Sequence, residues 1–176
     1  YSVPNSNLNQ LAEGEKYQVT YEVVSRGGDK HQIVITVVGT NDAPTVTALT
    51  LTHGTEDTNY QMHASQFGFT DVDNNDTLHS ISITDIPTAS EGKFILDGKD
   101  MAPNQVIDVG DINKLQFVPR ADFNGDIHFK FTVNDGHTDS AEATGTLHLN
   151  PVNDATVDSG IRDLGATNED TSKSLS

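Results

Sequence analysis

The sequence contains no cysteine and no tryptophan, and aromatic residues make up only 6% of its 176 residues. A fold held together by disulfides, or by a metal bound through thiolates, is therefore excluded. The scarcity of aromatic side chains also argues against a sugar-binding platform, which needs exposed rings for stacking. No apolar run approaches the roughly 18 residues that a membrane helix needs. We therefore expect no membrane insertion.

Positive charge is also scarce, because 10 Lys and Arg residues stand against 26 Asp and Glu residues, for a formal net charge of −16. A surplus of this size repels nucleic acid and anionic membranes, since both carry dense negative charge. Nucleic acid is therefore excluded as a partner. The natural counterparts of such a chain are cations.

Alternation of apolar and polar residues dominates the sequence and predicts β-strands. From Ile127 to Val133 every odd position is apolar and every even position is polar, as a strand with one buried face requires. Similar patterns predict strands at 17–23, 31–38, 78–83, 115–118 and 144–149. Asn124-Gly125 indicates a tight hairpin turn, and the Asn-Asp-Gly sequence at 134–136 indicates another turn. Short strands separated by frequent turns predict an all-β sandwich.

Two motifs recur at the spacing of a domain. Asn-Asp-Ala at 41–43 returns 112 residues later at 153–155, and Glu-Asp-Thr at 56–58 returns 113 residues later at 169–171. Two markers with nearly the same period indicate tandem modules. We predict the end of one module at 1–42, a complete module at 43–154 and the start of a third at 155–176. We expect this last segment to be mobile or to pair adventitiously, because it lacks partner strands.

Carboxylate and amide side chains are concentrated in the run Asp71-Val72-Asp73-Asn74-Asn75-Asp76. Calcium accepts six to eight oxygen ligands in irregular geometry, whereas zinc prefers His and Cys, which this run lacks. The run does not complete an EF-hand loop, because its sixth position is Asp76 instead of Gly and its twelfth is Ser82 instead of Glu. Any calcium here needs ligands from elsewhere in the chain. The alternative is that Asp and Asn only form turns and keep the surface soluble, but like charges at this density favour a neutralising cation.

Six short motifs follow one another through the predicted complete module: Asn-Asp-Ala-Pro at 41–44, Glu-Asp-Thr at 56–58, Phe-Thr-Asp-Val-Asp at 69–73, Leu-Gln-Phe-Val-Pro at 115–119, Phe-Asn-Gly at 123–125 and Phe-Thr-Val-Asn-Asp-Gly at 131–136. Through these motifs, residues 43–154 resemble the cadherin-like modules of giant bacterial surface adhesins of the RTX type. Residues 1–42 resemble the C-terminal part of a VCBS repeat, through Leu-Ala-Glu-Gly-Glu at 11–15 and the ending Ile-Thr-Val-Val-Gly-Thr-Asn-Asp at 35–42.

The resemblance implies an immunoglobulin-like, antiparallel β-sandwich in tandem array, with Ca²⁺ bound at the junctions between modules. For the upper junction it implies the ligands Asn41, Asp42, Asp71, Asp73 and Asp135. For the lower junction it implies Glu56, Asp122, Asn153 and Asp154. A first strand from Pro44 to about Glu56 is long enough to bring Glu56 to the second linker.

The function that the resemblance implies is that of a calcium-binding extender module in a large secreted or cell-surface bacterial protein. Calcium would stiffen the junctions for cell adhesion or biofilm formation, and the partners would be neighbouring repeats of the same chain, with host or bacterial surface ligands bound through other domains. A sugar- or peptide-binding sandwich is the alternative. The sequence lacks Gly-x-Ser-x-Gly, His-Glu-x-x-His and phosphate-binding motifs, so we predict no enzymatic activity.

Overall fold

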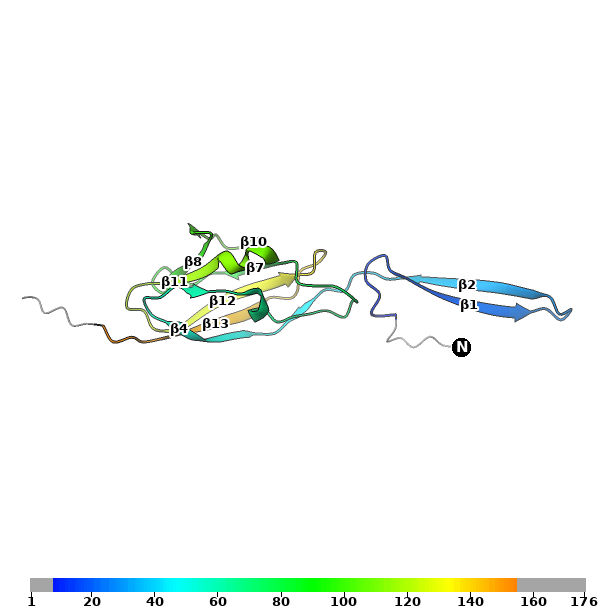
Figure 1. The fold of residues 1–176 in the computed structure, drawn as a ribbon, viewed down its shortest axis with the longest axis horizontal. Coiled ribbons are helices and arrows are strands. Elements are labelled where there is room, and N and C mark those ends of the chain that lie inside the picture. The colour runs from blue at the N-terminus through cyan, green and yellow to red at the C-terminus, as the bar shows by residue number, and fades with distance from the viewer. Residues whose placement is uncertain (1–7, 155–176) are drawn as a thin grey trace, which may run out of the picture.

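The structure, a computed structural model, describes residues 8–154. It consists of a long β-hairpin that extends from one end of a β-sandwich (Figure 1). The hairpin pairs β1 (Lys16–Val24) with β2 (Lys30–Val38) in antiparallel register. The predicted third segment, 155–176, lies outside the described residues. Within the described residues, no helix is long and apolar enough to cross a membrane.

The sandwich consists of two main sheets and one small one. In spatial order, the five-stranded sheet contains β10 (Gln105–Asp108), β7 (Ser80–Asp85), β12 (Gly125–Asn134), β13 (Ala143–Asn150) and β4 (Leu49–Thr55). The four-stranded sheet contains β5 (Tyr60–Gln61), β11 (Leu115–Pro119), β8 (Gly92–Leu96) and β9 (Lys99–Asp100). The small sheet pairs β3 (Thr45–Val46) with β6 (Phe69–Thr70), and two 3₁₀ helices cover Ala64–Gln66 (η2) and Val109–Lys114 (η3). The β-sandwich prediction is therefore confirmed.

The core lies between the two main sheets, where alternate residues of each strand point inward. Along β12, Ile127, Phe129, Phe131 and Val133 are each at most 1% exposed, while the intervening side chains face outward. Phe94 of β8 bridges the layers, because its ring lies edge-on to Phe129 at 5.2 Å between centroids. Burial of these aromatic and aliphatic side chains is the main source of stability in the sandwich.

Gly145 of β13 provides the space that the ring of Phe129 occupies. The two residues are cross-strand partners, and a Cβ atom at position 145 would lie 2.2 Å from Phe129 Cζ. Any side chain there would displace the ring from the core. The alternating pattern at 144–149 thus includes one position that must remain glycine for packing reasons.

The first strand of the module reaches across the sandwich as predicted, but it is divided in two. Thr45–Val46 pairs with β6, whereas Leu49–Thr55 pairs with β13 in parallel, so the sandwich is not wholly antiparallel. The division allows one segment of chain to cover the edges of two sheets. It still delivers Glu56 to the far end of the module, because the Glu56 N–H donates to Asn150 O at 3.0 Å.

The hairpin turn predicted at Asn124-Gly125 is wrong. β11 pairs with β5 and β8, whereas β12 pairs with β7 and β13, so the connection between β11 and β12 crosses from one sheet to the other. Gly125 adopts φ of 119° at the start of β12. The turn predicted at 134–136 is confirmed, since β12 and β13 are antiparallel neighbours joined across it.

Candidate metal sites at the two ends of the sandwich

Acidic and amide side chains gather at both ends of the sandwich. We call the end nearest the hairpin the upper junction, formed by linker residues 39–44 and the loops 71–76 and 134–139. We call the opposite end the lower junction, formed by residues 56–57, 120–124 and 150–154. The strands on either side fix these loops, and the two ends are separated by the length of the sandwich (Figure 1).

At the upper junction, the loop after β6 folds back on itself and then receives the linker. The backbone N–H of Asp73 donates to Asp71 Oδ1 at 3.0 Å, which is the local turn that Asp favours. The backbone N–H of Asp42 donates to Asp73 Oδ2 at 2.8 Å. Asp73 is only 5% exposed. The linker and this loop are therefore joined through a buried carboxylate.

Asp135, at the turn after β12, is the second anchor of the upper junction. Its Oδ1 accepts backbone N–H groups from His137 at 2.6 Å and Thr138 at 2.7 Å, and its Oδ2 accepts from Asn41 Nδ2 at 3.1 Å. Burial alone would raise the pKa of Asp135, but these hydrogen bonds outweigh burial and hold the pKa below its ordinary value. Asp135 is therefore an ionised carboxylate, 9% exposed, that faces the linker.

Four oxygen atoms of the upper junction are buried and have no hydrogen-bond partner among the described residues: Asn41 Oδ1, Asp71 Oδ2, Asp73 Oδ1 and Asp76 Oδ2. Carboxylate oxygens from Asp71, Asp76 and Asp135 lie within 4.8 Å of one another. An unpaired buried acceptor costs free energy, and three neighbouring carboxylates add mutual repulsion. Carboxylate and amide oxygens without hydrogen-bond partners are the kind of ligand that a hard cation such as Ca²⁺ takes.

The crowding of negative charge at the upper junction affects the pKa of Asp76. Burial raises the pKa of Asp76 above its ordinary value, and the negative charges of Asp71, Asp73 and Asp135 raise it further. The pKa rises because the charged form has lost water and gained like-charged neighbours. A cation among these four carboxylates would remove the second of these causes.

At the lower junction, Glu56 is buried but fully engaged. Its Oε1 accepts the backbone N–H of Val152 at 2.6 Å, and its Oε2 accepts from Asn124 Nδ2 at 2.8 Å. The hydrogen bond from Asn124, followed by that from Val152, holds the pKa of Glu56 below its ordinary value. Glu56 therefore fastens the start of the second linker to the module without help from an ion.

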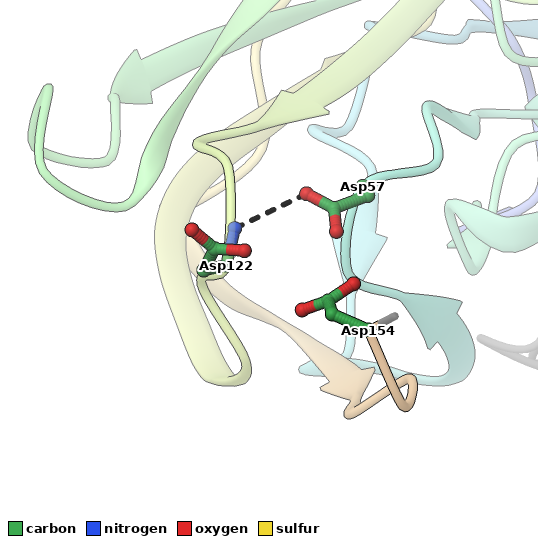
Figure 2. A group of neighbouring side chains, drawn as sticks. All are labelled: Asp57, Asp122 and Asp154. Carbon is green, nitrogen blue, oxygen red and sulfur yellow. Dashed lines mark hydrogen bonds between the residues drawn. The ribbon is translucent and has the colours of Figure 1, made fainter. Parts of the chain in front are cut away.

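The lower junction also contains three exposed carboxylates. Asp57, Asp122 and Asp154 place oxygens within 4.8 Å of one another, and Figure 2 shows the three side chains turned toward a common space. The backbone N–H of Asp122 donates to Asp57 Oδ1 at 3.1 Å. Loss of solvation, followed by the charges of Asp122, Asp57 and Glu56, raises the pKa of Asp154. The lower cluster is negatively charged like the upper one, but its side chains are exposed to solvent.

The structure gathers most of the residues predicted from the sequence. Asn41, Asp71, Asp73 and Asp135 meet at the upper junction, and Glu56, Asp122 and Asp154 meet at the lower one. Asp42 contributes its backbone N–H to Asp73, and Asn153 donates its side-chain amide to the backbone oxygen of Asp154 at 3.5 Å.

Sequence reasoning missed Asp76 and Asp57 as members of the two clusters. Asp76 closes the acidic run that begins at Asp71, and Asp57 belongs to the Glu-Asp-Thr motif that recurs at 169–171. Both residues therefore carried a sequence signal. Spacing alone does not show which carboxylate of an adjacent set points into a cluster.

A comparison against protein families matches residues 40–150 to the cadherin-like domain. The chain belongs to the cadherin-like domain family. Cadherin-like domains are adhesion-type modules, typically extracellular, and they generally bind calcium. A search of curated proteins found no match. Among solved structures, the chain is similar to the crystal structure of human mucin-like protocadherin EC1-2, with 17% identity and a TM-score of 0.40 over 77% of this chain and 69% of that one.

Proposed function

We propose that this cadherin-like chain is a calcium-binding extender module of a large secreted or cell-surface bacterial adhesin, in which Ca²⁺ stiffens the junctions between modules. The observation that carries the proposal is the set of four buried oxygens without partners at the upper junction. These oxygens belong to three carboxylates and one amide, which are groups that bind calcium. The set contains none of the nitrogen and sulfur ligands that zinc prefers.

At the upper junction, Asn41, Asp71, Asp73, Asp76 and Asp135 would hold the ion. Asp73 and Asp135 are already fixed by hydrogen bonds to the linker and to their own loops, so little side-chain freedom is lost on binding. Because Asn41 belongs to the linker and Asp135 to the module, an ion between them would join the two parts. Bending at the linker would then require breaking metal–oxygen contacts.

At the lower junction, Asp57, Asp122 and Asp154 would bind Ca²⁺ when a following module supplies further ligands. Glu56 adds an acceptor here, because each of its oxygens keeps a second lone pair beyond the hydrogen bond that it accepts. Asn153 and Asp42 add amide and carboxylate oxygens in the two linkers. Calcium prefers six to eight oxygens, and three exposed carboxylates fill only part of that shell.

We also propose that residues 1–42 are the end of a preceding VCBS-like module. In the β1–β2 register, Val19 lies opposite Ile35, and both point to the same face of the hairpin. Ile33 and Ile35 are each 49% exposed, so no described part of the chain covers this face fully. An apolar face on a two-stranded ribbon favours a missing second layer, since an isolated hairpin is only marginally stable.

The setting that suits such junctions is extracellular, and in the parent protein they would serve adhesion or biofilm formation. Extracellular calcium modules have dissociation constants of about 10⁻⁴ to 10⁻³ M, so their sites fill outside cells and stay empty in cytosol. Carboxylates that repel one another without the ion would let the chain bend during export and straighten afterwards.

Differential scanning calorimetry of the 176-residue chain in calcium and in chelator tests this proposal. At a calcium concentration about 100 times the dissociation constant, linkage predicts about 2.7 kcal/mol of added stability, or a rise in Tm of about 10 °C. Magnesium at the same concentration is the control and should give a much smaller rise, because it demands strict octahedral geometry. Equal Tm values in calcium and in chelator would contradict the proposal.

A further inference from the structure

The loop before β1, residues 8–15, forms contacts with the sandwich that need no metal ion. Leu11 in this loop is only 7% exposed, although it lies outside the hydrophobic core of the sandwich. The backbone oxygen of Gln10 accepts the N–H of Asn74 at 3.0 Å, which joins this loop to the acidic loop of the upper junction. A segment that precedes the hairpin is thus docked on the module that follows it.

Gly39, the first residue of the linker, lets this loop lie against the chain. Its N–H donates to Glu15 O at 2.8 Å, and its own oxygen accepts the Gly14 N–H at 3.1 Å. A Cβ atom at position 39 would lie 2.3 Å from Leu11 O and 2.4 Å from Ala12 O. Both obstacles are backbone atoms, so a larger residue would have to push the whole loop away from the linker.

A second set of contacts joins the loop and the linker to the turn after β12. Glu13 Oε2 lies 2.9 Å from His137 Nδ1, and Asn41 Nδ2 donates to Thr138 Oγ1 at 3.3 Å. The first pair is about half exposed on each side, so it adds little stability by itself. The hydrogen bond between Gln10 and Asn74 therefore carries the docking on the sandwich, and the close backbone approach at Gly39 ties the docked loop to the end of the hairpin.

We infer that residues 8–15 act as a brace that fixes the hairpin on the sandwich in the absence of calcium. The brace and the proposed ion site act on the same junction through different residues: backbone atoms of Gln10, Gly39 and Asn74 for the brace, and side-chain oxygens for the ion. Calcium therefore tightens a joint that the polypeptide has already oriented. The inference does not depend on calcium being bound.

Double electron–electron resonance, which measures the distance between two spin labels, tests the brace in the full chain. The sequence contains no cysteine, so Gly27→Cys in the hairpin loop and Ala102→Cys on the sandwich introduce unique labelling sites. In chelator, we expect a single narrow distance distribution for the chain with only these two changes. Adding Gly39→Ala should broaden that distribution about twofold, and adding Leu11→Ala should broaden it less.

Gly110→Ala is the matched control, because a Cβ atom at that position meets nothing within 4 Å, and it should leave the distribution narrow. A broad distribution in chelator before any brace residue is changed would overturn the brace. So would a distribution that Gly39→Ala and Leu11→Ala both leave unchanged. Calcium binding is read separately from the Tm of the same samples. Narrow distances without a calcium-dependent Tm would support the brace and overturn only the proposed metal site.

Discussion

The two ends of the sandwich carry the same kinds of residue but satisfy them in opposite ways. At the upper junction, buried oxygens of Asn41, Asp71, Asp73 and Asp76 have no partner among the described residues. At the lower junction, the buried carboxylate of Glu56 has a hydrogen bond on each oxygen, and the remaining carboxylates of Asp57, Asp122 and Asp154 are exposed. The buried oxygens of the upper junction therefore lack partners in the described part of the chain, whereas the buried carboxylate of the lower junction has them and the other carboxylates there are exposed to water.

Acidic composition alone therefore does not identify a metal site. A buried carboxylate with two good donors is stable without an ion, because hydrogen bonds replace the water it has lost. A buried carboxylate with an orphaned oxygen keeps that cost until something positive arrives. The upper junction should therefore respond strongly to calcium, and the lower junction should respond weakly until a neighbour completes it.

The largest expected effect comes from removing the central carboxylates of the upper junction. Asp71→Ala together with Asp73→Ala should abolish the calcium-dependent stabilisation of about 2.7 kcal/mol while lowering stability in chelator by only about 1 kcal/mol, the value of the lost hydrogen bonds. Calorimetry in both media measures the two quantities. Asp108→Ala, an exposed carboxylate with no side-chain cap bond, is the control. An equal loss in calcium and in chelator would mark Asp71 and Asp73 as turn residues only.

Glu56→Gln should behave in the contrasting way, because Glu56 stabilises the fold through hydrogen bonds. The amide nitrogen of Gln would face either Asn124 Nδ2 or the Val152 N–H, so one acceptor is lost. We expect Tm to fall by roughly 5 °C in calcium and in chelator alike. A loss confined to calcium would show that Glu56 acts as a ligand first.

The pH dependence of Glu56 follows from its lowered pKa. Since the folded pKa lies below the unfolded one, its contribution is present at neutral pH and is lost as pH falls through the folded pKa. Glu56→Gln should therefore flatten the acid limb of the curve of Tm against pH. An unchanged acid limb would contradict the assignment.

Asp76→Asn should stabilise the chain in chelator and weaken its response to calcium. The folded pKa of Asp76 is raised, so its charge lowers stability at neutral pH, and stability is recovered as pH falls through that pKa. Removing the charge should add about 1 kcal/mol without calcium, on the order of the cost of an unpaired buried acceptor. Chemical denaturation in chelator at neutral pH measures this gain. A destabilised variant in chelator would show that Asp76 makes a favourable contact.

The smallest effect is expected at the exposed cluster. Asp57→Asn and Asp122→Asn should each change stability by less than about 0.5 kcal/mol, because surface substitutions away from buried networks have little effect. Both residues adopt positive φ, at 58° and 61°, which Asn tolerates as well as Asp. Denaturation with and without calcium measures the change. A calcium-dependent loss as large as that from Asp71→Ala with Asp73→Ala would show that the two junctions bind calcium equally.

The strands of the sandwich with strict alternation were predictable from the sequence because one buried face imposes a period of two. β12 is the strongest case, and β11 and β13 follow the same rule. The sequence did not reveal the short strands β5, β6 and β9, each two residues long, because pairing partners define them and no periodicity fits in two residues. The Asn124-Gly125 turn failed for a related reason: local turn chemistry does not show whether the flanking strands share a sheet.

The candidate sites were predictable to the level of loops and less so to the level of atoms. Alternate spacing nominated Asp71 and Asp73, and the long first strand placed Glu56 beside the second linker, where the structure has it. The sequence did not show that Glu56 is satisfied by Asn124, or that Asp42 donates through its backbone. Such roles depend on side-chain and peptide orientations that tertiary contacts decide.

The most direct test of the central claim is a high-resolution crystal structure of this chain grown with calcium. We expect spherical density at the upper junction, coordinated by six to eight oxygens at about 2.3 to 2.6 Å, with ligands from Asn41, Asp71, Asp73, Asp76 and Asp135. Density for water alone among these oxygens, at hydrogen-bond distances and with no ion, would contradict it.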